Sequence, residues 1–167
     1  MARQIDESKP FFLVGVSFGG MIAVELNKFI SPLQTIIISS ASTDAQIPWY
    51  YKIVGRLKIY KLVPVKVLKA ATPLTCWFFG TKTEEEKSLL EQILKDTDGS
   101  FLKWAISKIA KWDQKITTKG IYHVHGTADR ILPVAFIQPD FNVIGGRHLM
   151  VYSQNKIITK ILADRFG

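Results

Sequence analysis

The feature that most constrains the fold is a glycine-rich turn, GVSFGG at residues 15–20, set between a strand-like and a helix-like segment. Residues 11–14 (FFLV) form a continuous apolar run, which is typical of a strand buried on both faces of a parallel sheet. Residues 19–29 place apolar side chains at helical spacing, and the β-branched run at residues 33–38 indicates a second buried strand. Strand, helix and strand form a βαβ unit, so the beginning of the chain predicts a parallel sheet covered by helices.

The middle of the chain has a helical pattern broken by prolines and by an Asp-Gly step. One helix is expected to begin after Thr83 as its N-cap, with Glu86 completing a capping box, and to run to about Lys95. A second helix is expected over residues 101–112. Because this long helical stretch lies between strands, we interpret residues 47–112 as a cap or lid inserted into the sheet domain.

Strand patterns return after the cap, at residues 121–125 and 141–144, and the segment 148–166 carries apolar residues at helical spacing. The expected fold class is therefore α/β. We predict a mostly parallel sheet of about four strands with flanking helices and a helical cap insertion, in one domain that spans residues 1–167.

The charge balance is basic, with 22 Lys and Arg against 14 Asp and Glu, a net charge of +8. Such a balance fits nucleic acid, an anionic membrane surface, or solubility alone. We find no zinc spacing or RNP-like strand, so we expect no nucleic-acid partner. No charge-free stretch reaches the ~20 residues that span a bilayer, so we expect no stable membrane insertion. The basic, aromatic-rich segment 47–80 is either an acyl- or membrane-facing lid or an ordinary cap with a solvated basic face, and we prefer the latter.

A single cysteine, Cys76, excludes an intramolecular disulfide and is expected to be a small buried apolar residue. The first nine residues are polar and lack the apolar run of a signal peptide. We therefore expect a cytoplasmic protein in a reducing compartment.

Three loops that follow predicted strands each offer a different catalytic residue type: Ser17, Asp129 and His148. The carboxyl ends of parallel strands share one edge of a sheet, where ligands bind. A serine hydroxyl needs an imidazole to take its proton, and the imidazole needs a carboxylate to fix its tautomer. A sharp strand-to-helix turn would also aim the backbone N–H of Phe18 at a developing oxyanion. The residues thus suggest a Ser-His-Asp triad at one sheet edge.

The chain resembles the α/β-hydrolases through residues 12–20 (FLVGVSFGG), 125–133 (HGTADRILP) and 145–148 (GGRH), in the order Ser, Asp, His. The resemblance implies Ser17 as nucleophile, Asp129 as acid, His148 as base and the Phe18 N–H as an oxyanion donor. It also implies that residues 47–112 cap an acyl pocket.

The chain departs from this family at its beginning. The family normally has about four strands before the elbow strand, with an early loop that supplies a second oxyanion N–H, whereas ten residues precede Phe11 here. We therefore expect an N-terminally truncated α/β-hydrolase domain of low activity. We also expect it to self-associate through the exposed sheet edge, as a homo-oligomer.

Several other residues have alternative interpretations at this stage. Asp44, after the second strand, is a reserve candidate for the acid. Two histidines in the third predicted strand, His123 and His125, are expected to be structural. We expect Arg130 to form a surface salt bridge or, as the alternative, to hold a substrate carboxylate. Two tryptophans of the cap either line the pocket or belong to the core: Trp104 and Trp112.

The expected function is hydrolysis of a small or medium carboxylic ester, or thioester, through a Ser17 acyl-enzyme. No cofactor or metal is expected, because a triad needs neither. The alternative is a non-catalytic hydrolase fragment or interaction module that retains a relic triad.

Overall fold

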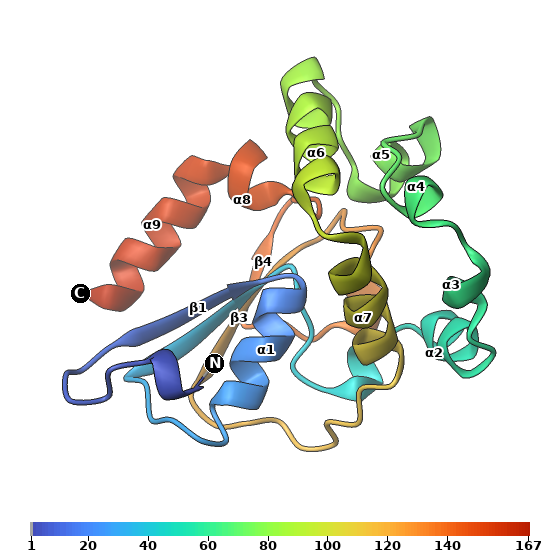
Figure 1. Cartoon of the computed structure of the whole chain (residues 1–167). Helices are drawn as coiled ribbons and strands as arrows, with labels where there is room; N and C mark the ends of the chain where they lie inside the picture. The colour runs from blue at the N-terminus through green and yellow to red at the C-terminus, as the bar shows by residue number, and fades with distance from the viewer. Residues whose placement is uncertain (1) are drawn as a thin grey trace.

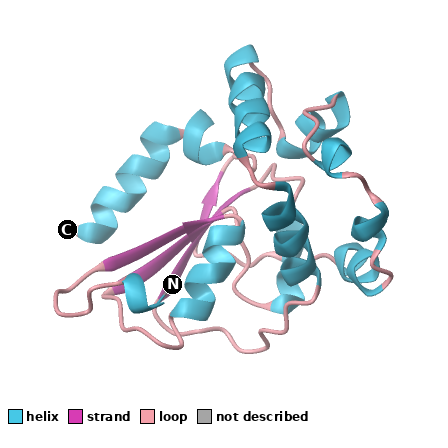
Figure 2. Ribbon diagram, viewed as in Figure 1, coloured by secondary structure: helices cyan, strands magenta, loops and turns pink. Residues whose placement is uncertain are grey.

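A four-stranded, fully parallel sheet organises the computed structural model, which describes residues 2–167 (Figures 1 and 2). The strands lie in chain order, β1-β2-β3-β4, and each neighbouring pair is parallel. The predicted sheet is therefore confirmed. The elements are η1 (Ala2–Gln4), β1 (Phe12–Val16), α1 (Phe18–Leu26), β2 (Gln34–Ile38), η2 (Asp44–Gln46), α2 (Trp49–Arg56), α3 (Ile59–Leu62), α4 (Val65–Leu68), α5 (Pro73–Phe79), α6 (Glu84–Asp96), α7 (Gly99–Ala110), β3 (Ile121–Gly126), η3 (Val134–Phe136), β4 (Phe141–Val143), α8 (Met150–Ser153) and α9 (Asn155–Phe166).

Strand β2 is the centre of the core, because its side chains are buried on both faces of the sheet. Ile37 packs with Ala23 and Val24 of α1 on one face. Ile36 and Ile38 pack on the other face with residues of α9. The continuous β-branched run that suggested a doubly buried strand thus has the environment it requires.

Strand β1 forms one edge of the sheet, and its outer side pairs with no strand among residues 2–167. Val14 and Val16 are in register with Ile36 and Ile38 and so share the face that α9 covers. They remain 42% and 40% exposed. An apolar strip therefore lies along this edge.

The helices α2–α7 all lie between β2 and β3 and form what we call the helical insertion (residues 49–110). Helix α6 begins at the predicted capping box: Thr83 accepts from the Glu86 N–H, and the Glu86 carboxylate accepts from the Thr83 N–H. Helices α2 and α7 pack closely, since a side chain at Gly55 would collide with Ala110. No helix within the described residues is long and apolar enough to cross a bilayer.

Two details of the sequence interpretation were wrong. The expected C-terminal helix is broken at Gln154, which separates α8 from α9 and lets Met150 and Ile158 both reach the core. Of the apolar residues at helical spacing in this segment, Ile158 and Ile161 are buried, whereas Ile157 is 45% exposed. Cys76 is only partly buried, because its helix α5 lies at the surface.

Candidate active site

Ser17 lies at a sharp turn between β1 and α1, with a left-handed backbone (φ 53°, ψ −124°) that non-glycine residues rarely adopt. Such strain typically costs about 1–3 kcal/mol and persists only where neighbouring groups enforce it. Here the Ser17 N–H donates to the Ile38 carbonyl at 2.9 Å, and the Ser40 hydroxyl donates to the Ser17 carbonyl at 2.7 Å. The end of β2 and the loop that follows it therefore hold Ser17 through both its N–H and its carbonyl.

The glycines of the turn are not equivalent. A Cβ at Gly15 would lie 2.6 Å from the Cα of Gly20, and one at Gly20 would lie 2.5 Å from the Cβ of Ser40. A Cβ at Gly19 would meet nothing within 4 Å. The structural requirement for glycine therefore falls at positions 15 and 20, and not at position 19 as the symmetric motif suggests.

The side chains of Ser17, His148 and Asp129 form one continuous chain of hydrogen bonds. The Ser17 Oγ lies 2.8 Å from the His148 Nε2, and the His148 Nδ1 lies 2.9 Å from the Asp129 Oδ2. Since a carboxylate only accepts, Nδ1 carries the proton and Nε2 is free to accept from the serine. The three predicted residues, drawn from three loops, are thus brought together in the arrangement that proton transfer from Ser17 requires.

The Asp129 carboxylate is fully buried and fixed by its own loop. Its Oδ1 accepts from the Ile131 N–H at 2.9 Å and from the Leu132 N–H at 3.0 Å. These bonds leave Oδ2 directed at His148. The imidazole is therefore oriented by a group that is itself immobilised.

The Phe18 N–H lies at the first turn of α1, where helix donors have no partner within the helix. It donates to no acceptor among residues 2–167. A helix N-terminus also favours negative charge. The donor predicted to face an oxyanion is therefore available beside the serine hydroxyl.

Asp44, the reserve acid, is committed to another pair of contacts. Its carboxylate accepts from Lys115 at 2.7 Å and from Lys52 at 3.2 Å. Burial alone would raise the pKa of Asp44, but the two lysines together bring it below its ordinary value. Asp129, not Asp44, bonds to His148.

The two histidines of β3 lie beneath the site and do not reach the serine. His125 donates from Nε2 to the Leu132 carbonyl at 2.8 Å, which buttresses the loop that carries Asp129. Burial lowers the pKa of His125, and burial beside His125 lowers the pKa of His123 to about 3. Both imidazoles are therefore neutral near pH 7 and serve the packing of the strand.

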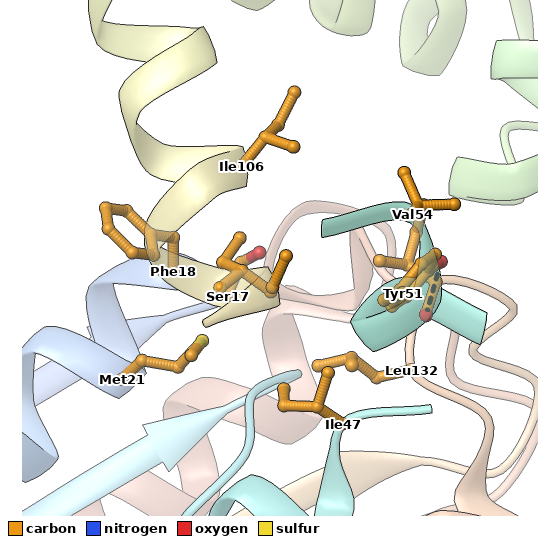
Figure 3. A pocket seen from close by; sticks show the side chains of 11 residues that line it. Ser17, Phe18, Met21, Ile47, Tyr51, Val54, Ile106 and Leu132 are labelled. Carbon is orange, nitrogen blue, oxygen red and sulfur yellow. Dashed lines mark hydrogen bonds between the residues drawn. The ribbon is translucent and has the colours of Figure 1, made fainter. Parts of the chain in front are cut away.

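An apolar cavity of about 180 Å³ opens beside Ser17, between α1 and the helical insertion (Figure 3). Its one phenol, Tyr51, donates to the Ile131 carbonyl at 2.9 Å, and burial, with the charges of Tyr50 and Asp129, raises the pKa of Tyr51 to about 12. The Ser17 hydroxyl is thus left as its reactive polar group. The lining residues are Ser17, Phe18, Met21, Ile47, Tyr51, Val54, Ile106, Ile109, Ala110, Ile131 and Leu132.

Of the two tryptophans expected at the pocket or in the core, Trp112 is partly buried and packs against two clusters of the core, whereas Trp104 does not. Trp104 is half exposed and contacts the outer side of the Phe18 ring at 5.7 Å between centroids. Trp112 donates to the Glu25 carboxylate at 2.7 Å. Neither lines the cavity beside Ser17.

Arg130 does not form the expected surface salt bridge with any of residues 2–167, and its alternative role, contact with a substrate carboxylate, stays a prediction. Its guanidinium stacks 4.4 Å from the Trp77 ring and donates to the Trp77 carbonyl at 2.9 Å. A second arginine, which sequence reasoning missed, makes a similar contact: Arg147 donates to the Gly80 carbonyl at 2.6 Å. The sequence signal was available, since each arginine is adjacent to a triad residue.

Within residues 2–167, no group of three or more His, Cys, Asp or Glu side chains is arranged to hold a metal ion.

Comparison with solved structures identifies the fold as that of the α/β-hydrolase superfamily. A thermophilic esterase from Thermogutta terrifontis matches with a TM-score of 0.63 at 14% identity, over 94% of this chain and 64% of its own. A metagenomic epoxide hydrolase of that superfamily, from a hot environment, matches with a TM-score of 0.60 at 13% identity. The match covers 95% of this chain and 68% of the epoxide hydrolase. Polyneuridine aldehyde esterase matches with a TM-score of 0.56 at 18% identity, over 99% of this chain and 75% of the esterase.

The chain thus has an α/β-hydrolase fold and spans about two thirds of the length of these structures. Neither the protein-family models nor the curated proteins include a match to the chain.

Proposed function

We propose that this chain is a serine hydrolase that cleaves a small or medium carboxylic ester, or thioester, through an acyl-enzyme on Ser17. The observation that carries the proposal is the hydrogen-bonded chain from Ser17 through His148 to Asp129 at the mouth of an apolar cavity.

In the proposed acylation, the Ser17 Oγ attacks the ester carbonyl carbon while the His148 Nε2 takes the hydroxyl proton. Asp129 stabilises the imidazolium through the Nδ1–H bond. The oxyanion faces the Phe18 N–H, and collapse of the tetrahedral intermediate expels the alcohol or thiol, which takes the proton from Nε2. Water then attacks the acyl carbon by the same steps and releases the acid and free Ser17.

The cavity supports an apolar acyl group of limited length. A protein cavity of about 150 Å³ lined by aliphatic and aromatic side chains holds benzene. By that measure a cavity of about 180 Å³ accepts roughly six or seven carbon atoms.

We further propose that turnover is slow. The contacts around Ser17 identify one candidate oxyanion donor within residues 2–167, the Phe18 N–H. Loss of one donor from an oxyanion hole typically reduces the rate by about 10²–10³. Because acylation and deacylation each pass through a tetrahedral oxyanion, we expect both steps to be slowed.

The test is labelling with a fluorophosphonate probe, which reacts with activated serines. We expect the probe to label the wild-type chain and the matched control Ser100→Ala, which changes an exposed serine of α7. Ser17→Ala and His148→Ala should abolish labelling. Asp129→Asn should slow it by about 10⁴, because the amide favours the wrong imidazole tautomer, while Asp113→Asn at an exposed site should not. Folded wild-type protein that resists the probe would support the non-catalytic alternative.

A further inference from the structure

Helix α5 (Pro73–Phe79) of the helical insertion rests on the two loops that carry the candidate acid and base. Arg130 follows Asp129 in the chain and donates to the Trp77 carbonyl. Arg147 precedes His148 and donates to the Gly80 carbonyl. One arginine from each loop therefore binds the carboxyl end of the same short helix.

Both contacts are built into the local geometry. Gly80 ends α5 in a left-handed conformation (φ 76°), and a Cβ there would lie 2.9 Å from the Cβ of Arg147, so the arginine stem packs directly on the glycine. The Arg130 guanidinium stacks on the Trp77 ring. Cations at a helix carboxyl end also interact favourably with the helix dipole.

Phe79 connects this end of α5 to the imidazole of His148. This residue precedes Gly80, and its ring meets the His148 ring edge-on, with 5.5 Å between the centroids and planes 80° apart. His148 is only 4% exposed. The ring of Phe79 thus limits rotation of an imidazole whose Nε2 must stay directed at Ser17.

We propose that Arg147, assisted by Arg130, is a positioning residue that holds Phe79 against His148 and so keeps the imidazole aligned with the Ser17 hydroxyl. This inference rests on the proposed hydrolase function. The helical insertion is then coupled to the proton-transfer step and not only to substrate binding. Release of α5 would misalign the base.

The test compares Arg147→Met, which keeps the stem but removes the guanidinium, with Phe79→Ala and the double variant. We expect each single change to slow acylation of Ser17 by about 10- to 100-fold with KM nearly unchanged, since misplacement of a catalytic group acts on the chemical step. The double variant should be no slower than either single variant, because both act through one contact. Arg147→Lys should recover part of the rate. Arg165→Met, which removes another stacked arginine, over Tyr122, is the matched control and should have no effect.

Two readouts are independent of activity. In Arg147→Met, hydrogen exchange at the amides of residues 77–81 should accelerate. The nitrogen-15 spectrum of the His148 ring should change from one bonded form to an exchanging mixture. Faster exchange with an unchanged histidine spectrum would overturn the positioning role, as would additive effects in the double variant. A wild-type chain that never acylates would refute the proposed function, while the histidine spectrum would still decide whether Arg147 holds the ring.

Discussion

The size of the cavity beside Ser17 makes the dependence of acylation on acyl length a stringent prediction. Each methylene moved from water into an apolar site contributes about 0.8 kcal/mol, or roughly a fourfold gain in rate constant if it is realised in the transition state. From acetyl to hexanoyl the gain is at most about 3 kcal/mol, or about 200-fold. Because a hexanoyl group already fills the cavity of about 180 Å³, octanoyl and decanoyl esters should acylate Ser17 no faster than hexanoyl esters, or more slowly.

The assay is the first-turnover release of nitrophenolate from p-nitrophenyl acetate, butyrate, hexanoate, octanoate and decanoate, which reports acylation alone. Val54 of α2 lines the cavity (Figure 3), and Val54→Phe adds about four carbon atoms within it, so the optimum should shift to the short acyl groups. Its neighbour Ile53 is exposed and does not line the cavity, so Ile53→Phe should leave the optimum unchanged. A rate that rises steadily to decanoate, or the same profile in both variants, would refute the assignment of this cavity to the acyl group.

Three further predictions concern the elbow, the buried histidines and the sheet edge. Gly19→Ala should stabilise the protein by up to about 1 kcal/mol. Gly20→Ala introduces a Cβ that collides with Ser40, so it should lower the melting temperature and the rate of probe labelling. Equal effects of the two substitutions would contradict the conclusion that glycine is required at position 20 and not at position 19. Burial lowers the pKa of His123 to about 3, so the unfolded chain binds a proton that the folded chain does not, and stability is lost as the pH falls from about 6.5 towards 3. When the pH is lowered from about 7 to about 5, the free energy of unfolding measured with urea should fall by about 2 kcal/mol more for wild type than for His123→Leu. Equal falls in the two proteins would contradict the lowered pKa of His123. We also propose self-association through the β1 edge, so Val14→Lys should reduce the concentration-dependent mass seen by sedimentation, and an unchanged monomer in both proteins would contradict this.

Local rules were sufficient to predict the strands and the positions of the triad. The apolar runs before Gly15 and at β2 require a doubly covered sheet, and parallel strands present their carboxyl ends at one edge. That edge is where Ser17, Asp129 and His148 meet. Each strand and each candidate residue was recognised from its neighbours in the chain, and the parallel order of the strands then brought the three loops to one edge.

The errors occurred where contacts join segments far apart in sequence. Gly20 of α1 is constrained by Ser40, which follows β2, and Arg130 by Trp77 of the helical insertion, so neither role follows from local pattern. The break at Gln154 likewise reflects two helices that must reach the same core from different directions. Side-chain periodicity identifies the apolar face of a helix or strand, but it does not identify the element against which that face packs.

The contacts around His148 also bear on how the helical insertion and the sheet can evolve together. The Asp129 carboxylate is fixed by the backbone of its own loop, through Ile131 and Leu132, and that loop contacts the insertion through Tyr51 and Arg130. His148 is packed directly against Phe79, a residue of the insertion. A change in α5 would therefore act directly on the packing of His148, and on Asp129 only through the contact between Arg130 and Trp77.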